Sequence, residues 1–320
     1  SAPRGLRGMI RPRAAVAAAR AAARHGVPFT VSSMSTCALE EIARDASPPL
    51  WFQMYIWRDR GLTREFAARA SAAGCQALCL TLDVQVLATR DRDHHNGFFT
   101  VPSRVTARSV MEGLLSPRWL ATLARGPYPT FGNFKGVPGA GTTPQSLGAF
   151  ATDQLDPSVT WADLEWFRSV WDGPLVLKGI LSADDARRAV AHGADAVVVS
   201  NHGGRQLDGA AGAIEALPAV VDAVGGLADV ILDGGIRRGR DIVIARALGA
   251  TACMAGRPFV YGVGAYGERG VDLALGILRD EVDRTLALLG LSSMDAVNES
   301  CLLRPAAQSR PAGATLGAGA

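Results

Sequence analysis

The sequence has few of the residues that build metal sites. Its 320 residues include five cysteines, none in a CxxC pair, and Cys75 and Cys79 flank an apolar run that is typical of a strand. Zinc sites draw their ligands from closely spaced Cys and His residues, so this spacing speaks against a metal site. We therefore expect reduced, mostly buried thiols and no bound metal.

Long apolar runs and net charge are also scarce. No apolar stretch reaches the roughly 20 residues that span a bilayer, and the alanine-rich run Ala14–Ala23 is interrupted by Arg20. The formal net charge is only +3, with basic and acidic residues interleaved, whereas nucleic-acid-binding surfaces concentrate basic residues. The sequence thus predicts a cytoplasmic location without a signal peptide or transmembrane helix, and small molecules rather than nucleic acid as partners.

Aromatic residues make up only 6% of the chain, whereas glycine accounts for 36 residues and hydrophobic residues for 48%. This composition supports a full hydrophobic core with many turns and closely packed helices. The length suits one large α/β domain better than two small ones.

Short apolar runs alternate with helical segments along most of the chain, which is the pattern of parallel βα units. Seven runs are predicted strands: Pro28–Ser32, Leu50–Tyr55, Ala77–Asp83, Pro174–Lys178, Ala196–Ser200, Asp229–Asp233 and Thr251–Ala255. Helices are predicted at Ala14–His25, Leu62–Ala73, Ala183–His192, Ile214–Val224 and Gly239–Leu248. Because a helix precedes the first of these strands, an eight-stranded barrel needs an earlier strand, which would end in Ser1-Ala2-Pro3. We therefore expect a (β/α)8 TIM barrel over residues 1–304 that lacks most of the N-terminal segment and of strand 1.

Two segments depart from this alternation. Residues 99–157 are rich in Pro and Gly around one predicted helix near Ser116–Ala124. Loops of this length are uncommon inside compact domains, so we expect an insertion over the barrel mouth. Residues 305–320 are rich in Pro, Ala and Gly without periodicity, which predicts a disordered tail.

Polar residues follow nearly every predicted strand, at the edge where βα barrels carry their active sites. The clearest case is the segment Asp233-Gly234-Gly235-Ile236-Arg237, which is followed about twenty residues later by Gly256-Arg257. The glycines allow backbone N–H groups to approach an anion, each segment opens a helix, and the arginines suit bidentate contacts. These two segments together predict a phosphate site.

Three other segments leave alternatives open. Lys178 ends an apolar strand, where it could form a Schiff base or stabilise negative charge on a ring. A single His is most often structural, but His202 lies among glycines with Arg205 as a carboxylate clamp, which favours a general base acting on a bound acid. Arg90 belongs to a charged segment that is equally typical of a solvated loop.

Residues 200–208 (Ser-Asn-His-Gly-Gly-Arg-Gln-Leu-Asp), with Leu-Lys-Gly-Ile at 177–180, Asp-Gly-Gly-Ile-Arg at 233–237 and Gly-Arg-Pro at 256–258, resemble the FMN-dependent α-hydroxy-acid oxidising family. This family includes glycolate oxidase, lactate oxidase, mandelate dehydrogenase and the flavin domain of flavocytochrome b2. The resemblance, which runs from Ala2 to about Arg304, implies oxidation of an (S)-2-hydroxy acid to the 2-oxo acid, with FMN N5 accepting the electrons as a hydride or through a carbanion.

Two rival interpretations are weighed against this one. Another FMN barrel, such as a type 2 isopentenyl diphosphate isomerase or an inosine monophosphate dehydrogenase-like enzyme, would share the phosphate site but not the clamp formed by Arg90, His202 and Arg205. The second rival is a truncated or catalytically impaired FMN-binding barrel.

Carried over residue by residue, the resemblance implies that His202 is the base and that Asp83 orients and stabilises it when protonated. Substrate would be bound by Tyr55, Arg90 and Arg205. Lys178 would lie near the flavin N1 and O2, which favours charge stabilisation over a Schiff base. The other implied cofactor-binding residues are Pro3, Arg4, Gly5, Ser32, Gln53, Thr81 and Ser200 around the flavin, and Asp233, Gly234, Gly235, Arg237, Gly256 and Arg257 in the phosphate segments.

The chain departs from the family pattern at the end of strand 1. Family members usually have Ala-Pro-Thr-Ala or Ala-Pro-Thr-Gly there, so Arg4 places a large cation where a small hydroxyl is usual. Gly5 resembles the dehydrogenase members and is expected to leave space beside the flavin, which favours an electron acceptor other than oxygen. The family's N-terminal segment, with its own substrate-binding tyrosine, has no counterpart in the sequence. The resemblance also implies a homotetramer, a quinone, cytochrome or O2 as electron acceptor, and peripheral membrane association as an alternative to a free cytoplasmic enzyme.

Overall fold

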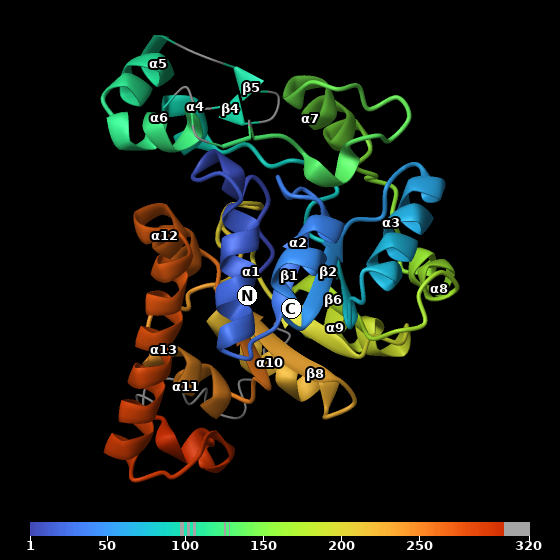
Figure 1. Cartoon of the computed structure of the whole chain (residues 1–320). Coiled ribbons are helices and arrows are strands. Elements are labelled where there is room, and N and C mark those ends of the chain that lie inside the picture. Colours follow the sequence, from blue (N-terminus) through green and yellow to red (C-terminus); the bar gives the residue numbers. More distant parts are fainter. Residues whose placement is uncertain (97–98, 101–102, 105–106, 125, 128, 304–320) are drawn as a thin grey trace, which may run out of the picture.

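The computed structural model describes residues 1–303 except 97–98, 101–102, 105–106, 125 and 128 (Figure 1). Seven parallel strands form one curled sheet in the order β1-β2-β3-β6-β7-β8-β9. The strands are β1 (Phe29–Ser32), β2 (Leu50–Met54), β3 (Ala77–Thr81), β6 (Leu175–Ile180), β7 (Ala196–Val199), β8 (Asp229–Asp233) and β9 (Ala252–Met254). All seven predicted strands are confirmed, with ends that differ by one or two residues.

The N-terminal residues lie between the two edges of this sheet. The amino group of Ser1 donates to the Pro28 carbonyl at 2.7 Å, next to β1, and the Ala2 N–H donates to the Ala255 carbonyl at 2.9 Å, next to β9. Ser1 and Ala2 therefore occupy the place of an eighth strand, as predicted. The fold is a (β/α)8 barrel without most of its first strand.

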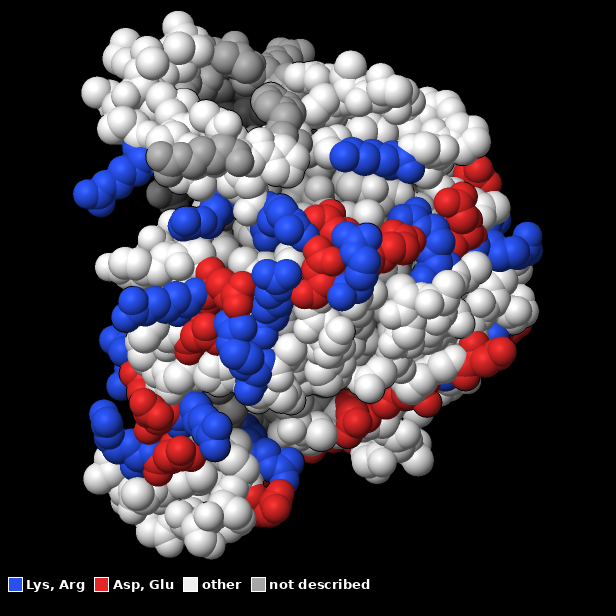
Figure 2. Space-filling model, in the orientation of Figure 1, with Lys and Arg blue, Asp and Glu red and all other residues white. Residues whose placement is uncertain are grey.

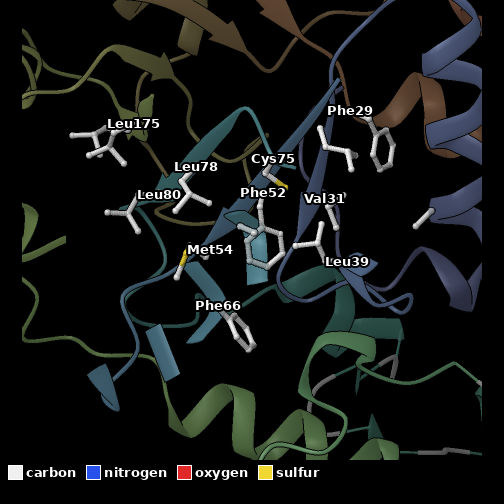
Figure 3. Close-up of a cluster of buried hydrophobic side chains, with 14 of the residues drawn as sticks. Phe29, Val31, Leu39, Phe52, Met54, Phe66, Cys75, Leu78, Leu80 and Leu175 are labelled. Carbon is white, nitrogen blue, oxygen red and sulfur yellow. The ribbon is translucent and has the colours of Figure 1, made fainter. Parts of the chain in front are cut away.

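The strands are buried on both faces, and alternate residues serve two different cores. One set, including Cys79, Val176 and Val198, packs with Ala2 in the centre of the barrel. The other set, including Phe52 and Leu78, packs against the surrounding helices (Figure 3). This period of two explains why the strands read as continuous apolar runs in the sequence.

Helices cover the outside of the sheet (Figure 1). They are α1 (Ala14–Arg24), α2 (Leu39–Ala46), α3 (Arg60–Ala72), α8 (Ala162–Arg168), α9 (Ala183–Ala191), α10 (Ala213–Val224), α11 (Gly239–Ala247), α12 (Arg257–Tyr266) and α13 (Glu268–Leu289). Short 3-10 turns occur at Arg7–Met9, Gly132–Phe134, Met294–Ala296 and Glu299–Cys301. At the junction of α12 and α13, a Cβ on Gly270 would lie 1.9 Å from the Gly262 carbonyl oxygen, so this close packing requires glycine.

The segment predicted as an insertion contains more regular structure than expected. The predicted helix is confirmed by α6 (Pro117–Ala124), but the expectation of a single helix is wrong. The additional elements are a hairpin of β4 (Phe99–Thr100) and β5 (Ser103–Arg104), α5 (Ala107–Leu114) and α7 (Pro144–Asp153), and α4 (Asp91–Asn96) lies just before the segment. The start of α7 carries a signal that the prediction missed, because Thr143 and Ser146 form a capping box before Pro144.

These elements gather at one end of the barrel (Figure 1). The predicted tail at 305–320 lies outside the described residues. Within the described ranges, every helix is too short or too polar to traverse a bilayer.

Candidate active site

A cavity of about 370 Å3 lies where the strands end. It brings together many of the residues predicted for the site, from segments far apart in the sequence. These residues are Pro3, Arg4, Gly5, Ser32, Gln53, Tyr55, Thr81, Arg90, His202 and Arg205. The remaining predicted residues do not line this cavity, but several of them contact those that do.

His202 and Asp83 form a hydrogen-bonded pair at the cavity. The Nδ1 atom of His202 lies 3.0 and 3.2 Å from the two carboxylate oxygens of Asp83, and both side chains are largely buried. A carboxylate at Nδ1 selects the tautomer in which Nδ1 carries the proton, which leaves Nε2 able to accept one. The pair therefore has the arrangement of a general base and the residue that orients it.

The loop that presents His202 has an unusual backbone. His202 has φ 58°, and the next two residues, Gly203 and Gly204, have φ 71° and 70°. Glycine adopts this left-handed region freely, whereas a histidine there carries a conformational cost. The His202 N–H donates to the Ser200 hydroxyl at 3.1 Å, which helps to hold the strained residue in place.

Asp83 can approach His202 because Gly179, which has no side chain, lies next to the Asp83 side chain. A Cβ on Gly179, which has φ 105°, would lie 2.7 Å from Cβ and 2.8 Å from Cγ of Asp83. The register between β6 and β7 also shifts at this point, between Lys178 and Ile180. Gly179 is therefore a positioning residue for the pair, and its place within the motif Leu-Lys-Gly-Ile was the signal available in the sequence.

A buried network lies below the cavity. The ammonium of Lys178, with 3% of its side chain exposed, lies 2.9 Å from the Ser200 hydroxyl and 3.1 Å from the Asp233 carboxylate. Ser200 in turn donates to Asp233 at 2.8 Å. The alternation of the strands turns these polar residues toward the barrel axis, in line with the central apolar residues.

Charge pairing dominates the ionisation of this network. Burial alone would lower the pKa of Lys178, but the nearby carboxylates of Asp233 and Asp83 outweigh it and raise this pKa. Burial likewise opposes ionisation of Asp233, yet Lys178 and the Ser200 hydroxyl hold its pKa below the ordinary value. Lys178 thus stays protonated, whereas a Schiff-base lysine must supply a neutral amine.

Two guanidinium groups and a phenol face the same space. Arg90 Nε is buried with no hydrogen-bond partner in the described part of the chain. Burial and then repulsion by Arg205 lower the pKa of Arg90. Arg205 Nη2 lies 4.0 Å from the Asp93 carboxylate. Burial, with the Asp83 carboxylate, raises the pKa of Tyr55, so its hydroxyl remains a hydrogen-bond donor. The arrangement suits an anionic ligand such as a carboxylate.

Unpaired polar atoms mark the flavin side of the cavity. Gln53 Nε2 and Thr81 Oγ1 are buried without a hydrogen-bond partner among the described residues, although Ser32 donates to Gln53 Oε1 at 2.9 Å. Nearly all buried polar atoms in proteins are paired, so atoms left unpaired at a cavity indicate a polar ligand. A flavin ring and its ribityl chain offer both donors and acceptors, and these residues therefore fit FMN.

The two predicted phosphate segments differ in which of their backbone N–H groups have acceptors within the protein. The Arg237 and Arg238 N–H groups both donate to the Asp241 carboxylate at 2.9 Å, and the Gly239 N–H donates to Glu281 at 2.7 Å. Carboxylates therefore already accept from these three N–H groups near the start of α11, and phosphate binding by this segment stays a prediction. The Gly256-Arg257 turn before α12 remains, and the glycines of the first segment keep open conformations, with φ 108° at Gly234 and 78° at Gly235.

The structure also corrects the expectation for Gly5. A Cβ at this position would lie 2.9 Å from both Cβ and the carbonyl oxygen of Met34, so Gly5 leaves no open space. Sequence reasoning missed several further lining residues. Leu6, Val84, Leu87 and Ala88 are close in sequence to predicted site residues, whereas Thr152 and Leu155 come from the segment around α7, where no motif marked them.

Comparisons with known proteins show the family of this chain. The family model described as FMN-dependent dehydrogenase matches residues 1–304. The L-lactate dehydrogenase of Alcaligenes faecalis is 44% identical over 305 residues, which cover 94% of this chain and 79% of the relative. That of Pseudomonas entomophila is 43% identical over 304 residues, covering 95% and 79%.

Solved structures are also similar. The monotopic membrane protein (S)-mandelate dehydrogenase has a TM-score of 0.89 and 40% identity, covering 94% of this chain and 79% of that chain. A mandelate oxidase with (S)-2-phenylpropionate has a TM-score of 0.75 and 38% identity, covering 92% and 75%.

Proposed function

This chain belongs to the FMN-dependent dehydrogenase family and is an FMN-dependent 2-hydroxy-acid oxidoreductase, and we propose that His202 is the general base in the oxidation of an (S)-2-hydroxy acid to the 2-oxo acid by FMN. The observation that carries this proposal is the pairing of His202 with Asp83 beside Arg90 and Arg205 in one cavity.

The substrate carboxylate would bind between Arg90 and Arg205, whose mutual repulsion an anion relieves. The protonated Tyr55 would donate a hydrogen bond to the substrate. Nε2 of His202 would then accept a proton from the substrate, and the carboxylate of Asp83 would stabilise the resulting imidazolium. FMN, when bound, would take up the two electrons and the second proton that leave the substrate.

The cofactor would be held by four groups of residues. Ser32, Gln53, Thr81 and Ser200 would meet the polar atoms of the ring and ribityl chain, and the backbone at Pro3, Arg4 and Gly5 would border the ring. Lys178 would place its cation where negative charge develops, since its carboxylate neighbours keep it protonated. The Gly256-Arg257 turn would bind the phosphate, with Asp233, Gly234, Gly235 and Arg237 completing the site.

We further propose that the enzyme is a dehydrogenase, with a quinone or cytochrome rather than O2 as electron acceptor. The similarity to the two L-lactate dehydrogenases supports this choice, while a mandelate oxidase of 38% identity makes oxygen the alternative to test. The cavity has an apolar side formed by Leu6, Met34, Val84, Leu87 and Leu155, which favours an acid with a medium or aromatic substituent.

The experiment is anaerobic addition of (S)-lactate, glycolate and (S)-mandelate to the purified, FMN-loaded protein, followed through the visible flavin band. Bleaching by one of these acids is expected, and bound FMN that none of them reduces would indicate an impaired barrel instead. Reoxidation by air, compared with reoxidation by a soluble quinone, then separates oxidase from dehydrogenase.

Peripheral membrane association is proposed on a separate observation. Large apolar side chains are exposed on and beside α5 and α6, including Met111 at 63%, Leu114 at 67% and Leu115 at 77%. Figure 2 shows this end of the molecule largely free of charge. The segment 104–125 carries four arginines and one glutamate, so an anionic lipid surface is the matching partner. The similarity to (S)-mandelate dehydrogenase, a monotopic membrane protein, supports this proposal.

Assembly into a homotetramer is proposed from the same family resemblance. Tyr261 and Tyr266 on α12 are 71% and 69% exposed, and Leu273 and Ile277 on α13 add apolar surface beside them. Light scattering coupled to size-exclusion chromatography would measure the mass directly, and a monomer would contradict the proposal.

A further inference from the structure

Arg4 has no part in the reaction proposed above, yet its side chain occupies a defined place at the edge of the cavity. A Cβ on Gly256 would lie 2.5 Å from both Nε and Nη2 of Arg4 and 2.9 Å from its Cζ. The guanidinium therefore lies directly against the backbone of Gly256. Arg4 thus reaches from the end of the missing strand to the turn that precedes α12.

Arg4 lies near one carboxylate and two other guanidinium groups. Burial lowers the pKa of Arg4, whereas among its charged neighbours Asp233 raises this pKa, and Arg257 and Arg205 lower it. The Asp233 carboxylate also contacts Lys178 and Ser200. Arg257 donates from Nη2 to the Gly203 carbonyl at 2.7 Å, so a neutral oxygen holds this guanidinium. Three guanidinium groups near one carboxylate that already pairs with Lys178 form a site that suits a bound anion.

The N–H groups near the start of α11 already have acceptors, so a phosphate at the Gly256 turn needs positive charge from side chains. The N–H groups of Arg237, Arg238 and Gly239 donate to Asp241 and Glu281, so they are less available to a phosphate than the turn at Gly256. Backbone N–H groups supply only partial charge, whereas a phosphate carries one to two negative charges. A guanidinium lying against that turn supplies the missing positive charge.

We propose that the Arg4 side chain binds the phosphate of FMN together with the Gly256 backbone and Arg257. The phosphate is then held from two directions, by the turn before α12 and by the segment at the end of the first strand. This inference rests on the proposed placement of the phosphate at Gly256 and Arg257, but not on the role of His202.

The test compares the binding of FMN and riboflavin, which lacks the phosphate, to the apoprotein through quenching of flavin fluorescence. In Arg4→Thr, the affinity for FMN is expected to fall about 10-fold or more, as for the loss of one charge-assisted hydrogen bond. The affinity for riboflavin should stay unchanged. Arg4→Lys keeps the charge and should retain part of the FMN affinity.

Arg284→Thr, on the exposed surface of α13, is the matched control and should alter neither affinity. An equal change for FMN and riboflavin in Arg4→Thr would show that Arg4 contacts or obstructs the ring or ribityl chain, and would overturn the proposal. No change for either ligand would overturn it as well. Circular dichroism of each apoprotein checks that the variants are folded.

This readout is independent of turnover. Failure of the proposed function would appear as bound FMN that no hydroxy acid reduces in the unmodified protein. Failure of the present proposal would appear only in the ratio of the two affinities.

Discussion

Nδ1 of His202 lies 3.0 Å from Oδ1 of Asp83, although 119 residues separate the two in the chain. Asp83 follows β3 and His202 follows β7, and the barrel brings the ends of these strands to the same face. The contact depends on Gly179, which follows Lys178 in β6, the strand between them, and leaves room for the Asp83 side chain. Three strands thus cooperate to orient one imidazole.

Removing the base and removing a phosphate ligand should have different effects. His202→Ala is expected to keep its flavin and lose anaerobic bleaching, with a rate at least about 10²-fold lower because general base catalysis is lost. Arg237→Ala is expected to weaken FMN retention instead, because Arg237 is assigned to the phosphate. Flavin content after gel filtration and the rate of bleaching measure the two effects. Equal loss of flavin in both variants would contradict these roles.

Gly179→Ala should impair the pairing of Asp83 with His202. The new Cβ would lie under 3.0 Å from two Asp83 carbon atoms, at a backbone φ of 105° that alanine rarely adopts. We expect slower flavin reduction and a shifted pH profile of kcat, with FMN still bound. Gly204→Ala has a similar positive φ but open space around it, and serves as the control for backbone strain alone. Equal effects of the two substitutions would argue against positioning of Asp83.

The buried pair of Lys178 and Asp233 predicts an acid-sensitive contribution to stability. Because the folded-state pKa of Asp233 is depressed, its carboxylate stabilises the fold at neutral pH, and this contribution is lost as the pH falls through that pKa. The pKa of Lys178 is raised, so its ammonium stabilises the fold at neutral pH. This contribution is lost in the alkaline range, as the pH rises through that pKa. Between these limits both groups remain charged.

Asp233→Asn should therefore lower the free energy of unfolding by about 3–5 kcal/mol at pH 7, because it leaves a buried ammonium unpaired. The difference from the unmodified protein should shrink in acid. Urea unfolding at both pH values measures it, with Asp229→Asn at the exposed start of β8 as a control of small effect. A difference that does not depend on pH would contradict the pairing.

Gly5→Ala tests the close approach of the N-terminal segment to Met34. The added Cβ would lie 2.9 Å from Cβ and from the carbonyl oxygen of Met34, so we expect destabilisation by about 1–3 kcal/mol. Gly276→Ala in α13 meets nothing within 4 Å and should be neutral or stabilising. Thermal or urea unfolding compares the two variants. If Gly5→Ala were as stable as the unmodified protein, the N-terminal segment would be able to move away from Met34 at little cost in free energy.

The apolar surface on α5 and α6 should bind anionic vesicles. Replacing both Leu114 and Leu115 by Ser is expected to reduce cosedimentation with phosphatidylcholine vesicles containing phosphatidylglycerol several-fold, since apolar insertion is lost. The control replaces Leu288 and Leu289 by Ser, at the end of α13, where they are 83% and 42% exposed. Absence of binding by the unmodified protein, or equal loss in both double variants, would contradict membrane association.

Local patterns carried much of this information. The seven strands and the helices between them follow from short-range periodicity, because strand alternation and helix repeats are properties of neighbouring residues. The motifs around His202, Lys178 and Arg257 marked their positions in the site before any contact was known. The segment around α4 to α7 was harder, since its helices are short and separated by Gly and Pro, and their starts depend on capping contacts such as that of Thr143 with Ser146.

Several features of the site were decided only by the tertiary structure. The sequence indicated a helix N-terminus at α11, but Glu281 from α13 and Asp241 occupy it. It also suggested open space at Gly5, but Met34 occupies the space where a side chain on Gly5 would begin. No sequence pattern predicted that the Arg4 side chain lies against Gly256.

The sequence by itself therefore determined the barrel and the family, and it predicted the groups that we propose to carry the chemistry, because these depend on local periodicity and on residue types at strand ends. The distances between those groups, the partners that leave them free or paired, and the direction of Arg4 depend on contacts between segments far apart in the chain. Only the closed arrangement of the strands decides those contacts.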